Sequence, residues 1–438
     1  MTDDDRRALR EAALAYHEQG RPGKLEVRVT KPMATGRDLS LAYSPGVAEA
    51  CLAIAEAPAD AARFTGRQNL VAVVSNGTAV LGLGDIGPLA SKPVMEGKAA
   101  LFKKFAGVDC FDIEVAETDP ARLAEIVAAL EPTFGAVNLE DIKAPECFQV
   151  ERLCRERMGI PVFHDDQHGT AIVAAAAASN ALRLSGRRFE QLKVVALGGG
   201  AAGIACLNLL KTLGVQADNM LVCDRKGVIH AGRDDLTPEK QAFAVETNAR
   251  TLDDAIEGAD LFLGVSGPGL LTPEQVAKMG PDPLIFALAN PIPEIMPEAA
   301  RAARPDALIA TGRSDFPNQV NNVLCFPFIF RGALDVGATE INDAMKIACV
   351  EAIAGLARAP AAAETARAYA GERLVFGPDY LIPKPFDPRL LASIAPAVAK
   401  AAMDSGVAER PIEDMDAYRA RLEGRVYRSG FLMKPVFE

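Results

Sequence analysis

The chain has 438 residues, of which 49% are hydrophobic and 24% charged, as is ordinary for a well-packed globular protein of roughly two or three domains. The formal net charge of −11 disfavours nucleic acid and anionic membranes as partners. The charged first ten residues do not resemble a signal peptide, and no apolar run is long enough to span a bilayer. The eight cysteines include no Cys-x-x-Cys pair, which indicates free thiols in a reducing cytoplasm.

The N-terminal region is predicted to begin with a charged helix from Asp3 to Gln19. The alternating residues Lys24 to Thr30 predict a strand, and Val47 to Glu56 predicts a helix after the break at Pro45-Gly46. Tyr43 stands just before that break. A tyrosine there is either a surface ring or a proton donor that projects into a cleft, and the residues alone leave both interpretations open.

A glycine-rich segment follows the first strong strand, which is predicted from Asn69 to Ser75. Asn76-Gly77 is a hairpin signal, so Ala79 to Leu83 is predicted as the returning strand. Gly82 to Gly87 matches the G-x-G-x-x-G pattern of dinucleotide sites. The match is weak, because Pro88 follows at once and no amphipathic helix opens inside the pattern. Tight turns are the better explanation of these glycines.

Lys98 is the lysine most strongly drawn towards the interior in the helix predicted from Pro93 to Ala106. Its neighbours along that helix are apolar, whereas Lys103 and Lys104 are predicted to face water. A lysine that is desolvated or lies near a bound cation has a lowered pKa and can act as a base. The alternative is an ordinary lysine that extends its ammonium to the surface.

Two short apolar runs, separated by helix-like sequence, each end in a pair of acidic residues. The first ends in Glu140-Asp141 and the second in Asp165-Asp166, after His164. Carboxylates that meet at the carboxyl ends of parallel strands would repel one another unless a hard divalent cation such as Mg²⁺ or Mn²⁺ held them. Solvated acids at strand ends are the alternative. Since neighbours on a strand point to opposite faces, Glu140 and Asp141 can share an ion only if the chain turns there.

A second glycine pattern stands in the context that dinucleotide binding requires. A predicted strand, Leu192 to Leu197, runs into a glycine turn and then into a helix, Ile204 to Leu213. The residues of the turn that we assign to the cofactor are Gly198, Gly200, Ala201, Ala202 and Gly203. Asp224 follows the next strand, where an acid usually binds the ribose 2′-hydroxyl, but Arg225 and Lys226 could instead hold a 2′-phosphate.

Polar residues also end the later strands of this region, as in a doubly wound sheet at its ligand edge. Asn290 follows the strand predicted from Leu284 to Ala289, and Asn321-Asn322 forms a compact polar patch. These amides could bind a polar ligand, and the capping of turns is the alternative for each. From Asp335 onward the chain is predicted to be largely helical.

The ordered set of motifs resembles the malic enzymes, and more closely the bacterial type found as the front half of a longer hybrid protein. In that type a phosphotransacetylase-like domain follows the malic enzyme portion, and this chain stops near Lys434. The matching motifs are LAYSPGVA (41–48), LGLGDIG (81–87), GKAALFKKFAGVD (97–109), NLEDI (138–142), DDQHGT (165–170), GGGAAGIA (198–205), NPIPE (290–294) and NQVNN (318–322).

The resemblance implies an α/β fold of three parts. A malate-handling N-terminal α/β domain (1–165) is followed by a Rossmann-type doubly wound parallel-sheet domain (166–390) that binds the nicotinamide cofactor, and a helical C-terminal extension (391–438) completes the chain. The active site lies between the first two.

The resemblance also assigns roles to residues. Lys98 is matched to the general base, Tyr43 to the general acid and Asp165 to the residue that orients the base. The matched metal ligands, for Mg²⁺ or Mn²⁺, are Glu140, Asp141 and Asp166. The matched substrate contacts are Asn290, which also lies beside the cofactor, and one of Asn321 and Asn322.

One departure weakens the substrate assignments. Many malic enzymes carry an arginine just before the LGLGDIG motif that pairs with a malate carboxylate. In this chain Ala79 and Val80 stand at that place. The carboxylate is then expected to be bound by the metal, by the amides or by backbone N–H groups.

The activity implied by the resemblance is the metal-dependent oxidative decarboxylation of (S)-malate to pyruvate and CO₂ with reduction of a nicotinamide cofactor. Asp224 favours NAD, whereas Arg225-Lys226 and the resemblance favour NADP, which we expect. The charged N-terminal helix and the long helical tail lead us to expect a homodimer or higher homo-oligomer, and the free thiols lead us to expect it in the cytoplasm. Two alternatives are a metal-independent two-domain amino-acid dehydrogenase and a non-catalytic nucleotide-binding module that regulates a partner.

Overall fold

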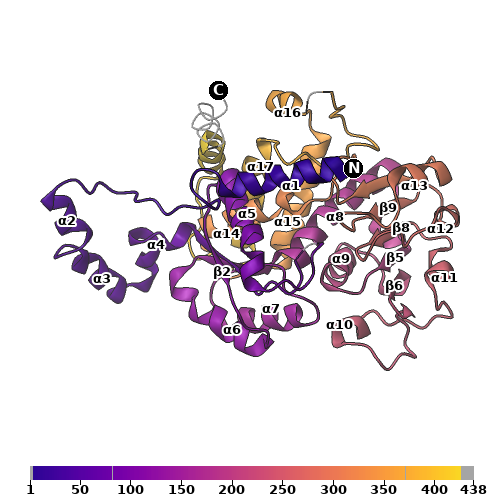
Figure 1. Cartoon of the computed structure of the whole chain (residues 1–438), viewed down its shortest axis with the longest axis horizontal. Coiled ribbons are helices and arrows are strands. Elements are labelled where there is room, and N and C mark those ends of the chain that lie inside the picture. The colour runs from indigo at the N-terminus through magenta and orange to yellow at the C-terminus, as the bar shows by residue number, and fades with distance from the viewer. Residues whose placement is uncertain (1–2, 81, 370, 426–438) are drawn as a thin grey trace.

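The computed structural model describes residues 3–80, 82–369 and 371–425. It confirms the α/β class, because two sheets of mostly parallel strands are covered by helices (Figure 1). The first sheet has the order β2-β1-β3-β4 and is wholly parallel. Its strands are β1 (Leu70–Ser75), β2 (Asp109–Glu114), β3 (Ala136–Leu139) and β4 (Val162–His164). The helices that follow them in the chain are α5 (Pro88–Ala106), α6 (Pro120–Ala129), α7 (Glu146–Arg157) and α8 (Asp165–Ser185).

The topology of the first sheet brings two loops together at its carboxyl edge. From β1 the chain passes to β2 on one side of β1, and it then crosses to β3 on the other side. The loops after β1 and β3 therefore leave two adjacent strands in opposite directions. A backbone hydrogen bond of 3.0 Å from the amide of Ala79 to the carbonyl of Asp141 joins these loops. The amide of Lys143 donates a second bond, of 3.0 Å, to Oγ1 of Thr78.

The second sheet has the order β10-β9-β8-β5-β6-β7, and the short β7 pairs antiparallel with β6. The chain reverses its direction of winding at β5, as in a doubly wound dinucleotide-binding sheet. Its strands are β5 (Val194–Leu197), β6 (Met220–Asp224), β7 (Gly227–Val228), β8 (Leu261–Gly264), β9 (Leu284–Ala287) and β10 (Leu308–Thr311). The intervening helices are α9 (Ala201–Thr212), α10 (Pro238–Gln241), α11 (Leu252–Ile256), α12 (Pro273–Ala277) and α13 (Pro297–Ala303).

The two sheets are tied together by α8, which runs from β4 towards β5. Its buried alanines allow close packing against α9 and α15. The chain then returns to the first sheet through α14, which packs on α5. The C-terminal helices are α14 (Phe326–Asp335), α15 (Asp343–Arg358), α16 (Ala363–Ala368) and α17 (Arg389–Asp404), and residues 415–425 are also helical. Short 3-10 helices are η1 (Pro58–Asp60), η2 (Arg67–Asn69), η3 (Glu131–Thr133), η4 (Phe189–Gln191), η5 (Ala217–Asn219) and η6 (Asn322–Leu324).

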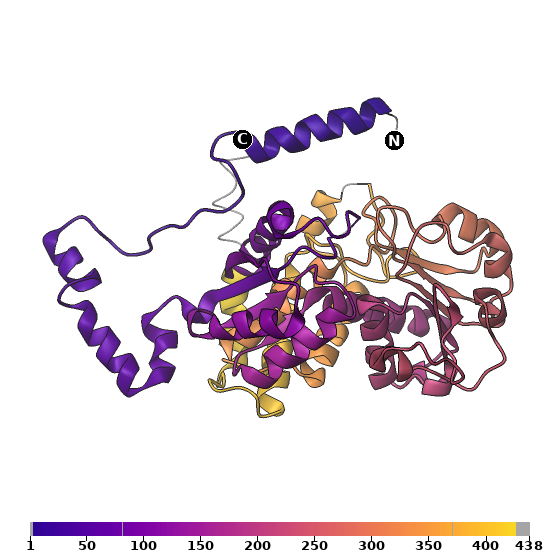
Figure 2. The same cartoon turned by 60° about the horizontal axis from the view of Figure 1, so that its bottom comes forward.

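The N-terminal residues lie apart from both sheets. They form α1 (Asp3–Glu18), α2 (Gly36–Ala42), α3 (Val47–Glu56) and α4 (Ala61–Phe64), and Figure 2 shows α2 and α3 projecting from the body of the molecule. The helices predicted at Asp3–Gln19 and Val47–Glu56 are confirmed. The strand predicted from Lys24 to Thr30 is wrong, because this exposed segment is extended without a neighbouring strand to pair with.

The hairpin predicted after β1 is also wrong. Both edges of β1 are already paired, with β2 and β3, so no returning strand can join it. Instead Gly82, Gly84 and Gly87 adopt positive φ angles and fold the segment into tight turns. Leu81 lies outside the described residues.

The domain boundaries at 165 and 390 stay predictions, and residues 426–438 of the third predicted part lie outside the described residues. Among the helices that the structure describes, none has the length and apolar character that a membrane span requires.

Candidate active site

The chain turns sharply at the first acidic pair. β3 ends at Leu139, and Asp141 has a φ of 53°, in the left-handed region that residues other than glycine rarely adopt. This turn allows Glu140 and Asp141 to face the same point, which an extended strand would forbid. The turn that a shared ion requires at Glu140-Asp141 is therefore present.

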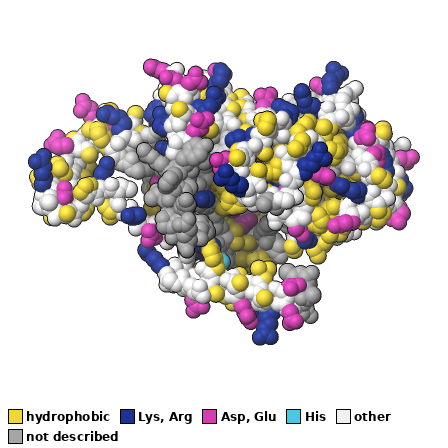
Figure 3. Space-filling model, turned by 90° about the horizontal axis from the view of Figure 1, so that it is seen from above, with side chains coloured by type: hydrophobic (Ala, Val, Ile, Leu, Met, Phe, Trp, Pro, Cys, Tyr) yellow, Lys and Arg dark blue, Asp and Glu magenta, His cyan; other side chains and the backbone are white. Residues whose placement is uncertain are grey.

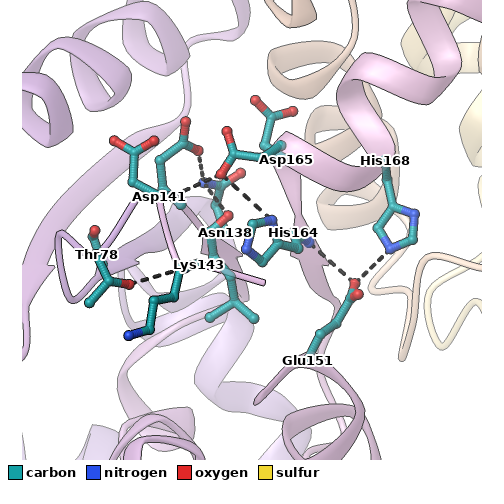
Figure 4. A network of polar contacts seen from close by, with 12 residues as sticks. Thr78, Asn138, Asp141, Lys143, Glu151, His164, Asp165 and His168 are labelled. Carbon is teal, nitrogen blue, oxygen red and sulfur yellow. Dashed lines mark hydrogen bonds and ion pairs between the residues drawn. The ribbon is translucent and has the colours of Figure 1, made fainter. Parts of the chain in front are cut away.

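The second acidic pair opens α8 directly after β4. Oδ2 of Asp166 accepts a hydrogen bond of 2.8 Å from the backbone amide of Asp141, so the two turns are tied together. One carboxylate oxygen from each of Glu140, Asp141 and Asp166 lies within 4.8 Å of the others. Figure 4 shows Asp141 of this cluster near His164 and Asp165, which lie where β4 meets α8.

This cluster fits a divalent cation on its electrostatics as well as its donors. Burial, and then the neighbouring carboxylates of Asp166 and Glu140, raise the pKa of Asp141 to about 9. Oδ2 of Asp141 is buried without a hydrogen-bond partner. Buried carboxylates that repel one another and leave an oxygen unsatisfied offer the oxygen ligands that Mg²⁺ and Mn²⁺ take.

Lys98 projects from α5 into this cluster and is buried. Its Nζ lies 2.8 Å from Oε1 of Glu140 and forms an ion pair with Oδ2 of Asp165. The ring of Phe326, at the start of α14, lies beneath the ammonium with its centroid 4.1 Å from Nζ. The ammonium of Lys98 therefore does not extend to the surface. Phe326 was missed by the sequence reasoning, because nothing in its apolar run marks a contact with Lys98.

The charges around Lys98 set its protonation. Burial by itself lowers the pKa of Lys98, but the carboxylates of Asp165, Glu140 and Asp166 together raise it above its usual range. Burial also raises the pKa of Asp165 to about 8, against the opposing effect of Lys98. Without a cation, Lys98 thus holds its proton, and a cation at the cluster would lower its pKa.

A second buried carboxylate fixes the turn between β4 and α8. Glu151, on α7, accepts a hydrogen bond of 3.3 Å from the amide of His164 and lies 2.8 Å from Nε2 of His168 (Figure 4). Although burial opposes it, His168 helps to lower the pKa of Glu151 to about 2. Glu151 therefore holds in place the segment that supplies Asp165 and Asp166. Sequence reasoning missed it, because it stands in the middle of a charged helix.

Tyr43 is not brought to Lys98 within one chain. Tyr43 directly follows α2 and is 73% exposed, and neither α2 nor α3 buries a residue. In Figures 1 and 2 these helices lie at the far end of the N-terminal projection, away from α5. The structure thus separates the predicted general acid from the predicted base.

The candidate amides differ in their surroundings. Asn321 caps η6 through a hydrogen bond of 3.0 Å from the amide of Val323. Cβ of Asn322 lies 3.0 Å from the position that a Cβ on Gly169 would occupy, which places it beside α8 and Asp165. Asn290 lies in the turn after β9, which meets the loop of the first glycine motif: a Cβ on Gly82 would stand 3.7 Å from Cδ of Pro291. Val80, one of the two residues at the place where the resemblance predicts an arginine, is buried.

The second glycine motif has the geometry of a dinucleotide site. Gly200 caps α9, with Ala201 and Ala202 in its first turn, directly after β5. A Cβ on Gly203 would stand 1.9 Å from the carbonyl oxygen of Gly198, so this close approach of helix and strand requires glycine.

Asp224, at the end of β6, is bound by two basic side chains that the sequence analysis did not identify. Arg233 contacts both of its oxygens, at 2.9 and 3.1 Å, and Nζ of Lys240 lies 2.7 Å from Oδ2. Although partial burial opposes it, these bonds lower the pKa of Asp224 to about 2. The sequence also offered Arg225 and Lys226 as side chains that could hold a 2′-phosphate. Lys226 pairs with Asp235 at 2.7 Å, and Arg225 is exposed.

Two family models match the chain. Residues 22–122 match the malic enzyme N-terminal domain and residues 167–369 match the malic enzyme NAD binding domain. The crystal structure of malic enzyme from Pyrococcus horikoshii superposes with a TM-score of 0.88 at 41% identity, covering 98% of this chain and 97% of that one.

Similar sequences are named for either cofactor. The NAD-dependent malic enzyme of Rhizobium meliloti is 65% identical over 97% of this chain, and the NADP-dependent malic enzyme of Escherichia coli is 62% identical over 98%. The chain spans about half the length of these relatives, 55% and 57% respectively. From these matches over nearly its whole length, the chain belongs to the malic enzyme family.

Proposed function

We propose that this chain catalyses the oxidative decarboxylation of (S)-malate to pyruvate and CO₂, with reduction of NADP and dependence on Mg²⁺ or Mn²⁺. The observation that carries the proposal is the meeting of Lys98, Asp165 and the three-carboxylate cluster at the carboxyl ends of β3 and β4. Malic enzyme relatives of both cofactor types support the activity.

In this proposal each group of the site has a distinct task. A divalent cation held by Glu140, Asp141 and Asp166 would act as a Lewis acid on the carbon-2 oxygen of malate. Lys98 takes the proton of the malate hydroxyl, and Asp165 holds its ammonium in position. A nicotinamide cofactor held at the glycine turn before α9 would accept the hydride from carbon 2. After CO₂ leaves, carbon 3 takes up a proton; the family resemblance assigns this step to Tyr43, which the fold of a single chain holds away from Lys98.

The substrate is positioned by amides rather than by an arginine. Asn322 lies beside Asp165, and Asn290 lies in the turn that meets the loop of the first glycine motif. We assign Asn322, in preference to the cap residue Asn321, to the malate carboxylate, because the side-chain oxygen of Asn321 already accepts a hydrogen bond.

The preference for NADP is supported by the charge around Asp224. Arg233 and Lys240 neutralise its carboxylate, so its oxygens do not stand free to accept the ribose 2′-hydroxyl. Asp235 also pairs with Arg233 and with Lys226, so the cations Lys226, Arg233 and Lys240 exceed the two carboxylates by one charge, and this surplus favours a 2′-phosphate. We further propose that the chain is the malic enzyme portion of the hybrid type, that it works in the cytoplasm and that it forms a homo-oligomer. Relatives of nearly twice its length support the hybrid assignment.

The test is an assay of the purified chain with malate, Mn²⁺ and either NADP or NAD. We expect an increase in absorbance at the band of the reduced nicotinamide, an equal amount of pyruvate, a faster rate with NADP and complete loss of activity after exhaustive EDTA treatment. Activity that survives EDTA with an amino acid as substrate would favour a metal-independent dehydrogenase. Binding of NADP without any turnover of malate would favour a non-catalytic module.

A further inference from the structure

A small cavity lies at the amino ends of the first sheet, opposite the ends that carry the carboxylate cluster. It is lined by Arg67 before β1, by Gly135 before β3 and by Gly159 before β4. The facing wall comes from the segment that follows α14 and from Arg410, beyond α17. Its volume of about 30 Å³ has room for one small ion and excludes a nucleotide.

The side chain of Arg410 is held in place by the backbone around the end of α14. The amide of Arg410 donates a hydrogen bond of 2.8 Å to the carbonyl of Val336, and its Nη2 donates one of 3.0 Å to the carbonyl of Leu334. The guanidinium lies flat over Gly337, because a Cβ there would stand 2.6 Å from Cζ, 2.7 Å from Nη1 and 2.8 Å from Nη2. The orientation of the guanidinium is therefore fixed before any ligand arrives.

The two arginines of the cavity lack an anionic partner. Nη2 of Arg67 makes one long hydrogen bond, of 3.4 Å, to the carbonyl of Glu131. Nε of Arg410 is buried without a hydrogen-bond partner among the described residues, and neither arginine forms an ion pair with any of them. Burial lowers the pKa of Arg410 and the charge of Arg67 lowers it further, although Glu409 opposes them.

This arrangement differs from the charges on the surface drawn in Figure 3, where basic side chains lie among acidic ones. In the cavity, two guanidinium charges repel each other and a desolvated N–H group has no acceptor, and both features cost free energy. The nearby carboxylates do not remove this cost. Glu409 is exposed, and Oε1 of Glu131 accepts a hydrogen bond of 3.1 Å from the amide of Gly159.

We propose that this cavity binds one small oxyanion of the phosphate class, held between Arg67 and Arg410. Two negative charges balance the two arginines, and the planar guanidinium fork matches the spacing of phosphate oxygens. The side-chain amide of Gln68, which also lines the cavity, supplies a neutral donor. The proposal does not depend on the proposed function, because the site lies at the opposite ends of the strands from Lys98 and the carboxylate cluster.

The bound ion has a structural consequence. It ties the amino ends of β1, β3 and β4 to the C-terminal helical region, since its ligands come from both walls of the cavity. A ligand that binds the folded chain and not the unfolded chain raises the free energy of unfolding in proportion to the logarithm of its concentration above its Kd. Phosphate is therefore expected to raise the thermal midpoint of this protein.

The site is tested by the thermal midpoint of the purified chain in increasing phosphate at constant ionic strength. Wild type, Arg67→Gln and Arg410→Gln are compared, and Arg63→Gln is the matched control, because Arg63 is an exposed arginine that pairs with Asp60 and does not line the cavity. The Kd that the series gives is expected to rise roughly tenfold or more in the two cavity variants, as for loss of one charge-assisted hydrogen bond, and to stay unchanged in the control.

Two comparisons separate binding from other effects of phosphate. Phosphate and sulfate stabilise most proteins because they are excluded from the surface, and phosphate could also occupy the turn before α9, so only the gain that Arg67→Gln abolishes belongs to the cavity. Without phosphate, Arg67→Gln is expected to be at least as stable as the wild type, because it relieves repulsion with Arg410. A purely structural Arg67 would make the variant less stable.

Sulfate, which has the same shape and charge, is expected to replace phosphate, whereas sodium chloride at the same ionic strength is not. An equal gain from phosphate in the wild type and in Arg67→Gln would overturn the proposal, as would an equal gain from chloride. If Arg410→Gln fails to fold, because it also loses the bond to Leu334, Arg67→Gln alone decides. The measurement involves no catalysis, so it holds whether or not the chain oxidises malate.

Discussion

The ammonium of Lys98 lies 2.8 Å from Oε1 of Glu140, which also belongs to the cluster of three carboxylates. The proposed base and the proposed metal site are therefore coupled electrostatically. The carboxylates by themselves favour the proton on Lys98, whereas a cation bound at Glu140, Asp141 and Asp166 would repel it. This coupling underlies the predictions on pH and on metal binding.

Metal binding should release protons and strengthen with pH. Without metal, the raised pKa of Asp141, about 9, keeps it protonated at pH 7, and a ligand carboxylate must lose that proton to bind a cation. We expect release of about one proton per Mn²⁺ at pH 7 and a roughly tenfold gain in affinity per pH unit up to about 9. Calorimetric titration in two buffers of different ionisation enthalpy measures both. An affinity that does not change between pH 6 and 8 would contradict the coupling.

The metal-free protein should lose stability as pH rises. Asp141 has a pKa of about 9 in the fold against its ordinary value of 3.8, so the folded state binds more protons than the unfolded chain between these values. The free energy of unfolding therefore falls as pH increases from about 4 to 9. Asp141→Asn removes this contribution, so the thermal midpoint of the metal-free variant should depend less steeply on pH than that of the wild type. A steeper dependence in the variant would show that the sign is wrong.

Gly169 should be essential for the position of Asp165. A Cβ at Gly169 would stand 2.0 Å from Oδ1 of Asp165, inside van der Waals contact, so Gly169→Ala must displace the carboxylate that holds Lys98. We expect malate oxidation to fall by ~100-fold, because misplacement of catalytic groups by about 1 Å has effects of this size. Gly355→Ala, on α15, is the control, since its Cβ would meet no atom closer than 3.8 Å. Equal activity of the two variants would refute this role.

Lys240 should determine the choice of cofactor. It binds Asp224 at 2.7 Å, and its Cε would lie 3.2 Å from a Cβ on Gly199, so it lies over the dinucleotide turn. Lys240→Gln is expected to lower kcat/KM for NADP by roughly 10- to 100-fold, the value of one charge-assisted hydrogen bond, with little change for NAD. Lys278→Gln, which breaks an exposed pair with Asp253, is the control. An equal fall in kcat/KM for both cofactors would show that Lys240 does not recognise the 2′-phosphate.

Local patterns were sufficient for much of the fold. Strand–glycine–helix order predicted the β5–α9 turn at Gly198. The acidic pairs at strand ends indicated that carboxylates meet there, and the family resemblance selected Glu140, Asp141 and Asp166 among them. The alternating pattern at Lys24 to Thr30 gave a wrong prediction, because a strand also needs a neighbour to pair with, and no described residue pairs with this segment as a strand. The alternating pattern there fits an exposed connection as well as a strand.

What sequence reasoning missed depends on contacts between distant segments. Arg233 and Lys240 reach Asp224 from a loop and a short helix that carry no periodic signal. Phe326 meets Lys98 because α14 returns to the first sheet. The position of Tyr43 was the largest gap. Its motif assigned a role, but only the fold shows that Tyr43, exposed between α2 and α3, lies away from Lys98 of the same chain.

Lys98 is the central residue of the proposed mechanism, as its general base. The rate of malate oxidation by Lys98→Ala with saturating Mn²⁺ and NADP tests this role directly. Lys103→Ala is the matched control, since Lys103 lies on the same helix with its side chain 61% exposed. We predict that Lys98→Ala loses ~100-fold or more of the wild-type rate, as expected for removal of a general base, while Lys103→Ala keeps it. A Lys98→Ala rate close to that of the wild type would contradict the account.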